Sequence, residues 1–128
     1  MTEPMTPRRG WREKFGEAFS GIRRAVRTES SFRVHLPVAA LVVALAAALG
    51  CTPIEWCLLI GCVGLVLTAE LFNTSMETLF KALDEHQKAR IEGCLDIAAG
   101  AVLMASLTAV AVGTVVFGSR VLEILDGA

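Results

Sequence analysis

The stretch IAAGAVLMASLTAVAVGTVVFGS, residues 97–119, contains no Asp, Glu, Lys or Arg. A second run without these charges covers residues 34–54, and residues 56–76 carry a single one, Glu70. Each run has at least the roughly 20 residues that a helix needs to cross a hydrocarbon core about 30 Å thick. The sequence therefore predicts an all-α integral membrane protein, with transmembrane helices over residues 34–54, 56–77 and 97–119.

Length and composition narrow the class of protein further. The chain has 128 residues, of which 54% are hydrophobic and 20% are charged. Because the three apolar runs take up about half of the chain, residues 1–128 are expected to form one membrane-embedded domain. A water-exposed enzyme cleft, a zinc module or a nucleic-acid-binding domain would each need polar surface that these runs lack. No nucleic-acid partner is therefore expected.

Basic residues are concentrated before the first apolar run. Of the 12 Lys and Arg residues, eight lie within residues 1–35, whereas residues 50–55 contain none and residues 81–96 contain three. The positive-inside rule places such basic segments in the cytoplasm. We therefore expect a multi-pass protein of the cytoplasmic (inner) membrane, with its N-terminus and residues 81–96 inside and its C-terminus outside.

The segment before the first apolar run divides into two parts. Residues 1–10 contain two Pro, two Thr and a Gly and are expected to be disordered. Residues 11–30 are expected to form an amphipathic helix whose apolar residues fall within an arc of about 100°. These are Trp11, Phe15, Ala18, Phe19, Ile22 and Val26. The apolar face either rests in the membrane interface, with arginines toward anionic headgroups, or packs on the protein's own spans.

Glu70 is the most informative residue in the sequence. A charge near the middle of a span costs about 2.5–3.5 kcal/mol on insertion scales, so such residues usually face a protein interior or a wet cavity. Asn73 and Glu77 share its helical face, with the two carboxylates about 10 Å apart along the axis. One interpretation is a functional polar stripe that reaches the cytoplasmic boundary. The alternative is a stripe that only joins helices by hydrogen bonds.

Two further carboxylates are expected at the same membrane face. Asp96 lies at the start of the third span, and Glu29 precedes the first. Carboxylates gathered so closely repel one another unless a cation lies between them, and Mg²⁺ with oxygen ligands is the simplest choice. Mg²⁺ bound in this way usually arrives with a nucleotide. Glu70 would then be placed to take a proton from a hydroxyl group presented out of the bilayer.

Two stretches closely resemble the prokaryotic diacylglycerol kinase family, which includes the undecaprenol kinases. They are FGEAFSGIRRAVRTESSFRVHL, residues 15–36, and AELFNTSMETLFKALDEHQKARIEGCLDIAAGAVLMAS, residues 69–106. The family signature is E-x-x-N-[ST]-x-x-E, followed further along the chain by D-x-[AG]-x-[AG]-A-V. In this sequence it is carried by Glu70, Asn73, Thr74, Glu77, Asp96, Ala98, Gly100, Ala101 and Val102.

The resemblance implies a three-span membrane kinase with an amphipathic surface helix, assembled as a homotrimer whose active sites are shared between subunits. It implies transfer of the γ-phosphoryl group of ATP to a lipid hydroxyl, either of diacylglycerol, giving phosphatidic acid, or of a polyprenol such as undecaprenol. Glu70 matches the general base, Glu29 and Glu77 match the Mg²⁺ ligands, and Arg33 matches a position near the lipid entrance. The positions that match nucleotide contacts are Asn73, His86, Gln87, Lys88 and Asp96.

Two residues depart from the family pattern. Leu95 stands where a Lys commonly precedes the conserved Asp, and Lys81 stands where an acidic residue is common. Because phosphoryl transfer depends on cations that neutralise developing charge, we hypothesise that Lys88 or Arg90 supplies the missing positive charge. The sequence contains no P-loop motif. Two other functions remain open, a catalytically degenerate family member and a small proton- or ion-conducting protein.

Overall fold

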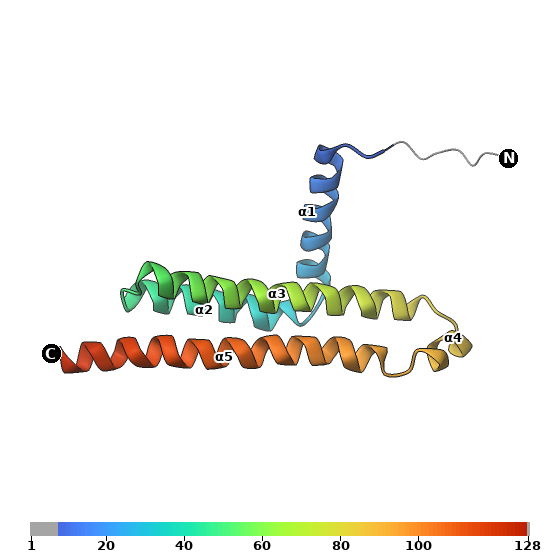
Figure 1. Cartoon of the computed structure of the whole chain (residues 1–128). Helices are drawn as coiled ribbons and strands as arrows, with labels where there is room; N and C mark the ends of the chain where they lie inside the picture. Colours follow the sequence, from blue (N-terminus) through green and yellow to red (C-terminus); the bar gives the residue numbers. More distant parts are fainter. Residues whose placement is uncertain (1–7, 128) are drawn as a thin grey trace.

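The computed structural model describes residues 8–127, and within them it contains helices and no strands (Figure 1). The helices are α1 (Trp11–Thr28), α2 (Phe32–Ala48), α3 (Pro53–Lys81), α4 (Glu85–Arg90) and α5 (Cys94–Asp126). The all-helical prediction is thus confirmed. The predicted disorder of residues 1–10 falls largely on residues 1–7, which lie outside the described part.

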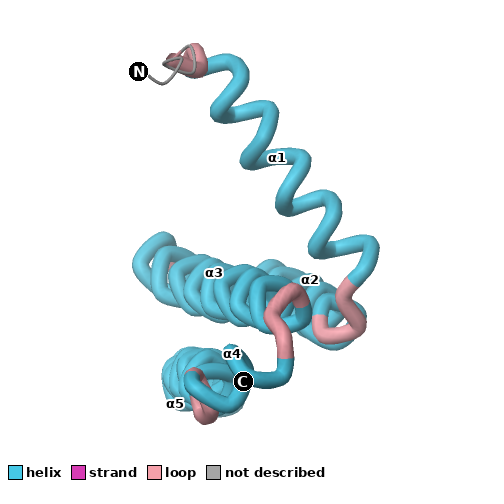
Figure 2. Tube along the Cα trace, turned by 90° about the vertical axis from the view of Figure 1, so that its right-hand side faces the viewer, coloured by secondary structure: helices cyan, strands magenta, loops and turns pink. Residues whose placement is uncertain are grey.

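Helix α3 is the centre of the bundle. It packs against α5 along much of its length and also contacts α1 and α2. Figures 1 and 2 show α2 beside α3, α5 along another side of α3, and α1 leaving the bundle at a steep angle. The buried apolar core joins one residue from each packed helix, Ala46 from α2, Leu59 from α3 and Val116 from α5.

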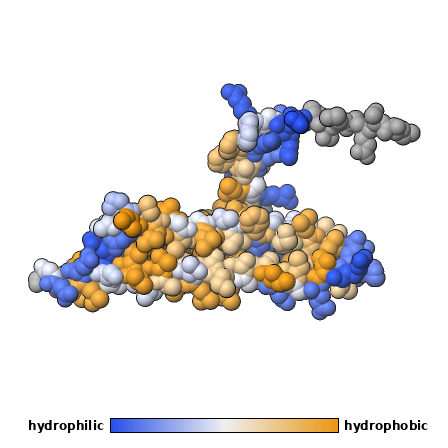
Figure 3. Space-filling view, in the orientation of Figure 1, coloured by the Kyte–Doolittle hydropathy of each residue, from blue (hydrophilic) through white to orange (hydrophobic). Residues whose placement is uncertain are grey.

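Two helices, α3 with 29 residues and α5 with 33, are long and apolar enough to cross a membrane on their own. Helix α2 has 17 residues and passes the same test only together with α1, from which it is bent by 104°. By length and composition, residues 8–127 therefore contain two spans, or three if this bent pair is one span. Figure 3 shows apolar side chains along the bundle and hydrophilic ones at its two ends.

The helix in the first apolar run is shorter than the expected span of residues 34–54. Helix α2 ends at Ala48, and Gly50 then takes the left-handed conformation, with φ of 65°. Helix α3 begins directly afterwards with a capping box, in which Thr52 and Glu55 satisfy each other's backbone N–H groups, and with Pro53 in its first turn. These local signals turn the chain between residues 49 and 52.

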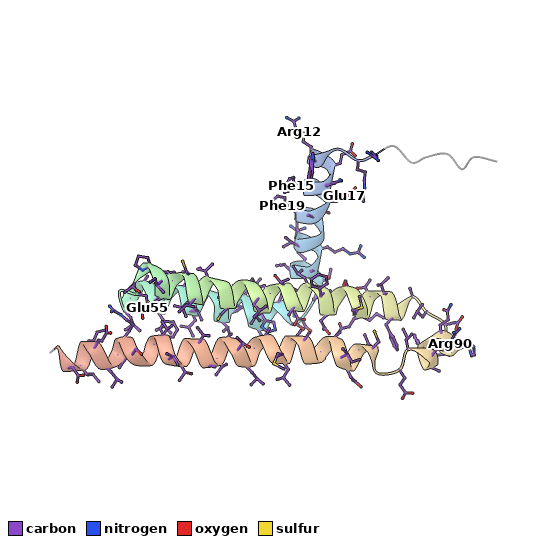
Figure 4. The ribbon with its side chains drawn as sticks, viewed as in Figure 1. Arg12, Phe15, Glu17, Phe19, Glu55 and Arg90 are labelled. Carbon is purple, nitrogen blue, oxygen red and sulfur yellow. The ribbon has the colours of Figure 1, made fainter. Side chains whose placement is uncertain are left out.

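The amphipathic helix expected over residues 11–30 is α1. Its aromatic residues Trp11, Phe15 and Phe19 are exposed, and the only buried residue of α1 is Ala25, near its C-terminal end. Figure 4 shows Phe15 and Phe19 on one side of α1 and Glu17 on the other. Within one chain, therefore, the aromatic face does not pack on the protein's own spans.

Candidate active site

The buried polar residues of the described chain all lie on one part of α3. Glu70 is 3% exposed, and Asn73 and Thr74 are buried beside it, while Glu77 one turn further on is half-buried. Burying a carboxylate costs free energy unless the charge finds a partner. A chain that exposes most of its large apolar side chains yet buries these polar ones has an unusual polar centre, which marks this part of α3 as the candidate site.

The partner of Glu70 is His35, from the first turns of α2. The Nε2 atom of His35 lies 3.4 Å from the Oε2 atom of Glu70. The sequence interpretation did not include His35 in the site. Counting from the turn would have found it, because His35 lies 15 residues before Gly50 and Glu70 lies 17 residues after Pro53. Two antiparallel helices joined by so short a turn bring these positions to similar depth.

Asn73 holds the second carboxylate of the stripe. Its Nδ2 atom donates to Oε1 of Glu77 at 3.0 Å. The Oδ1 atom of Asn73 and the hydroxyl oxygen of Thr74 are buried and have no hydrogen-bond partner within residues 8–127. Buried polar atoms are normally paired, so two neighbouring unpaired oxygens indicate a place for a ligand, a water molecule or a cation.

A groove lies on each side of this stripe. The first, about 770 Å³, is formed by α1 and α3 and is lined by Arg24, Glu29, Thr74 and Ser75 among others. The second, about 470 Å³, is formed by α3 and the start of α5, and Asn73 lies in its wall. On the helical wheel, Glu70 and Glu77 lie between the α3 residues that line the first groove and those that line the second. A groove therefore flanks the stripe on each side, while Glu70 itself is buried between them.

The structure does not bring the four expected carboxylates together within one chain. Glu29 is half-buried in the groove beside α1, and Asp96 is exposed in the first turn of α5. Over the described residues there is no group of three or more His, Cys, Asp or Glu side chains that could hold a metal ion. Glu29 lies at the sharp bend between α1 and α2, and Asp96 is exposed on a different helix, α5, that packs against α3.

The expected nucleotide-contacting loop forms the short helix α4. His86 and Gln87 are exposed, and Gln87 also closes a capping box with Asp84 at the helix start. The Nζ atom of Lys88 lies 3.5 Å from Glu85 and 5.5 Å from the ring centroid of Phe80. Figure 4 shows Arg90 at the α4 end of the bundle and Glu55 at the opposite end.

Arg33, the residue expected near the lipid entrance, is exposed in the first turn of α2. It lies two residues before His35, on the helix that supplies the partner of Glu70. Leu95 is half-buried in the first turn of α5, directly before Asp96. The structure thus places the expected site residues on α2, α3, α4, α5 and the α1–α2 junction.

Comparison with known proteins identifies the family. Residues 16–117 match the family model described as prokaryotic diacylglycerol kinase. The chain belongs to the prokaryotic diacylglycerol kinase family. The matched region contains the whole polar stripe of α3 together with His35 and Asp96. The candidate site therefore lies inside the part of the chain that matches the family.

Two relatives with curated names fit this family. A diacylglycerol kinase of Synechocystis sp. is 35% identical over 102 residues, which cover 77% of this chain and 57% of that protein. An undecaprenol kinase of Bacillus subtilis is 27% identical over 105 residues, which cover 82% of this chain and 85% of that protein. The chain thus aligns with little more than half of the Synechocystis kinase. No solved structure matches the chain.

Proposed function

We propose that this protein is an ATP-dependent lipid kinase that phosphorylates the hydroxyl group of diacylglycerol or of a polyprenol such as undecaprenol. The observation that carries the proposal is the buried carboxylate of Glu70 inside a membrane-length helix of a kinase family. A lipid hydroxyl lies at the membrane surface while its chains stay in the bilayer, so its base has to be reachable from within the membrane. Glu70 lies within a helix of membrane length, and its neighbours Thr74 and Asn73 line the two grooves beside it.

In the proposed reaction, the oxygen of the lipid hydroxyl attacks the γ-phosphorus of ATP. The bond between that phosphorus and the β–γ bridging oxygen breaks, and ADP leaves with the electron pair. Glu70 accepts the hydroxyl proton as the new oxygen–phosphorus bond forms. The products are a lipid phosphate, ADP and a proton on the carboxyl group, which is later released to water. Positioning and electrostatic stabilisation supply most of the rate enhancement in such transfers.

The residues on the stripe suit Mg²⁺, which prefers carboxylate and amide oxygens. Glu77, fixed by Asn73, and Glu29 would hold the ion, and the unpaired Oδ1 atom of Asn73 supports the presence of a ligand there. When bound, Mg²⁺ neutralises charge on the ATP phosphates. We assign the remaining nucleotide contacts to His86, Gln87, Lys88 and Asp96, and the lipid entrance to Arg33.

The assembly we propose is a homotrimer with active sites shared between subunits. Its support is that residues 8–127 of a single subunit contain no group of three or more His, Cys, Asp or Glu side chains that could hold a metal ion. A neighbouring copy can supply the missing side chains because α1 and α5 both carry long exposed faces. We further propose that the protein lies in the inner membrane with its N-terminus in the cytoplasm, on the distribution of basic residues.

The test is a phosphorylation assay with purified protein in mixed micelles. ATP labelled at the γ-phosphoryl group and Mg²⁺ are supplied with diacylglycerol and with undecaprenol in parallel reactions. The variant Glu70→Ala removes the proposed base, and Glu55→Gln, at the opposite end of the same helix, is the matched control. We expect label in one lipid, its loss in Glu70→Ala and its retention in Glu55→Gln. Label in neither lipid, or undiminished label in Glu70→Ala, would contradict the proposal.

A further inference from the structure

His35 and Glu70 form a polar contact across the packed helices α2 and α3. The side chains are 22% and 5% exposed, and the Nε2 and Oε2 atoms are 3.4 Å apart. Within residues 8–127 no other basic group lies within 4.0 Å of the Glu70 carboxylate, and no hydrogen bond to its side chain is formed. His35 is therefore the one described side chain that is placed to hold this carboxylate.

The surroundings of His35 leave few alternative partners. Its ring lies at one end of an apolar cavity of about 90 Å³ between α2, α3 and α5, whose walls include Val38, Val66 and Ala109. Apart from the weakly polar thiol of Cys62, the side chains of these walls offer His35 neither donors nor acceptors. Because an imidazole keeps a polar N–H in either protonation state, its favourable orientation is toward Glu70 rather than toward the cavity.

We propose that His35 is a positioning residue for Glu70. When the reactants bind, the Nε2–H group of His35 donates to Oε2 of the carboxylate, and Oε1 remains free to accept the proton of the lipid hydroxyl. No proton passes to His35 in this scheme. The inference rests on the proposed function of Glu70 as the base. It adds that a residue of α2, His35, sets the orientation of the Glu70 carboxylate.

The length of the contact is consistent with this role. At 3.4 Å it exceeds the usual N–H···O distance of about 2.9 Å. Catalytic contacts in a site without substrate are often long and shorten when the reactants bind. A carboxylate held by His35 adopts fewer unproductive orientations. The loss of His35 should therefore lower the rate of phosphoryl transfer, while the affinity for ATP changes little.

Kinetics of three variants test the role. His35→Leu removes the N–H group, His35→Gln keeps an amide N–H at a similar reach, and Val34→Ala changes an exposed neighbour on α2 as the control. We expect kcat to fall about 10- to 100-fold in His35→Leu, by analogy with the loss of residues that orient metal ligands. The KM for ATP should stay within about twofold, and His35→Gln should recover most of kcat.

A spectroscopic measurement tests the contact without catalysis. The chain has two histidines, His35 and His86, so protein labelled with ¹⁵N in histidine gives two sets of ring signals. The exchange Glu70→Gln should shift the ring signals of His35 and leave those of His86 unchanged, because His86 lies on α4. Unchanged His35 signals would overturn the contact and with it the inference.

The kinetic outcomes separate this inference from the proposed function. If the wild-type protein phosphorylates lipid, Glu70→Ala abolishes the transfer and His35→Leu keeps its kcat, the positioning role is wrong and the proposed function stands. If the wild-type protein phosphorylates neither lipid, the proposed function is wrong and the positioning role falls with it. An equal loss in His35→Leu and His35→Gln with a raised KM for ATP also contradicts the role, since it indicates a general structural defect.

Discussion

The guanidinium group of Arg120 donates a hydrogen bond of 2.7 Å to the carbonyl oxygen of Gly50. A second bond of 3.1 Å goes to the carbonyl of Leu49, so the last turns of α5 are tied to the end of α2. The carbonyl groups at a helix C-terminus lack partners within the helix and carry partial negative charge. A positive side chain that binds them joins two helices that otherwise share few contacts.

We therefore expect Arg120→Met to lower the free energy of unfolding by about 1–3 kcal/mol, because it leaves these carbonyl groups without their charged donor. Thermal unfolding in detergent micelles measures the change. The control is Glu123→Gln, which removes only the exposed ion pair of Arg120 with Glu123. Its effect should stay below about 0.5 kcal/mol, as for most surface pairs. Equal effects of the two variants would show that the carbonyl bonds contribute little.

Those parts of the fold that depend on local sequence could be predicted. The apolar runs indicate the helices, and the apolar arc of residues 11–30 indicates α1. The predicted helix over residues 34–54 ran past the end of α2, although Gly50, Thr52 and Pro53 are typical of a turn followed by a helix start. The capping box of Asp84 and Gln87 likewise marks the beginning of α4. These signals act over three or four residues and need no knowledge of packing.

The arrangement of the site depends on how whole helices sit against one another. The stripe of Glu70, Asn73 and Glu77 follows from helical spacing alone. The position of Glu29 depends on the 104° bend between α1 and α2, which no spacing rule gives. The contact of His35 with Glu70 depends on the register of α2 against α3. The sequence indicates the depth of each carboxylate in the membrane. It does not indicate on which side of α3 each carboxylate lies, so the expected convergence within one chain was not found.

The proposed metal site predicts a change in the Mg²⁺ requirement. Glu77→Gln removes a carboxylate charge but keeps an oxygen acceptor, and Asn73 then loses its charged partner. We expect the free Mg²⁺ concentration for half-maximal activity to rise about tenfold or more, as for other changes around metal ligands. A Mg²⁺ titration of the lipid kinase assay measures it, and Glu123→Gln is the control. An unchanged requirement would remove Glu77 from the metal site.

Leu95 stands where family members commonly have a Lys, and we hypothesise that Lys88 or Arg90 supplies the positive charge instead. If one of them contacts the ATP phosphates, Lys88→Ala or Arg90→Ala should raise the KM for ATP about tenfold, equivalent to about 1.4 kcal/mol. Leu95→Lys should restore part of the affinity in the affected variant. Lys14→Ala, on α1, is the control for loss of a positive charge. The hypothesis is wrong if both alanine variants keep the wild-type KM for ATP and the wild-type turnover of ATP.

The exposed aromatic face of α1 predicts where Trp11 lies. The chain has two Trp residues, so Trp56→Phe leaves Trp11 as the single tryptophan reporter. An amphipathic helix on a membrane buries its apolar face about 5–10 Å into the boundary between headgroups and acyl chains. In vesicles of lipids brominated along the acyl chain, we expect Trp11 fluorescence to be quenched most by bromines near the headgroup and least by those near the chain end.

The same experiment separates membrane contact from contact with another subunit. Phe15→Ser with Phe19→Ser weakens the apolar face on which Trp11 also lies, so the quenching by bromines near the headgroup should decrease if this face rests in the membrane. Ser20→Ala, an exposed position on the same helix, should leave it unchanged. If Trp11 is shielded from bromines at every depth, its face is covered by protein, and the exposed aromatic residues of α1 then form part of the contact between subunits.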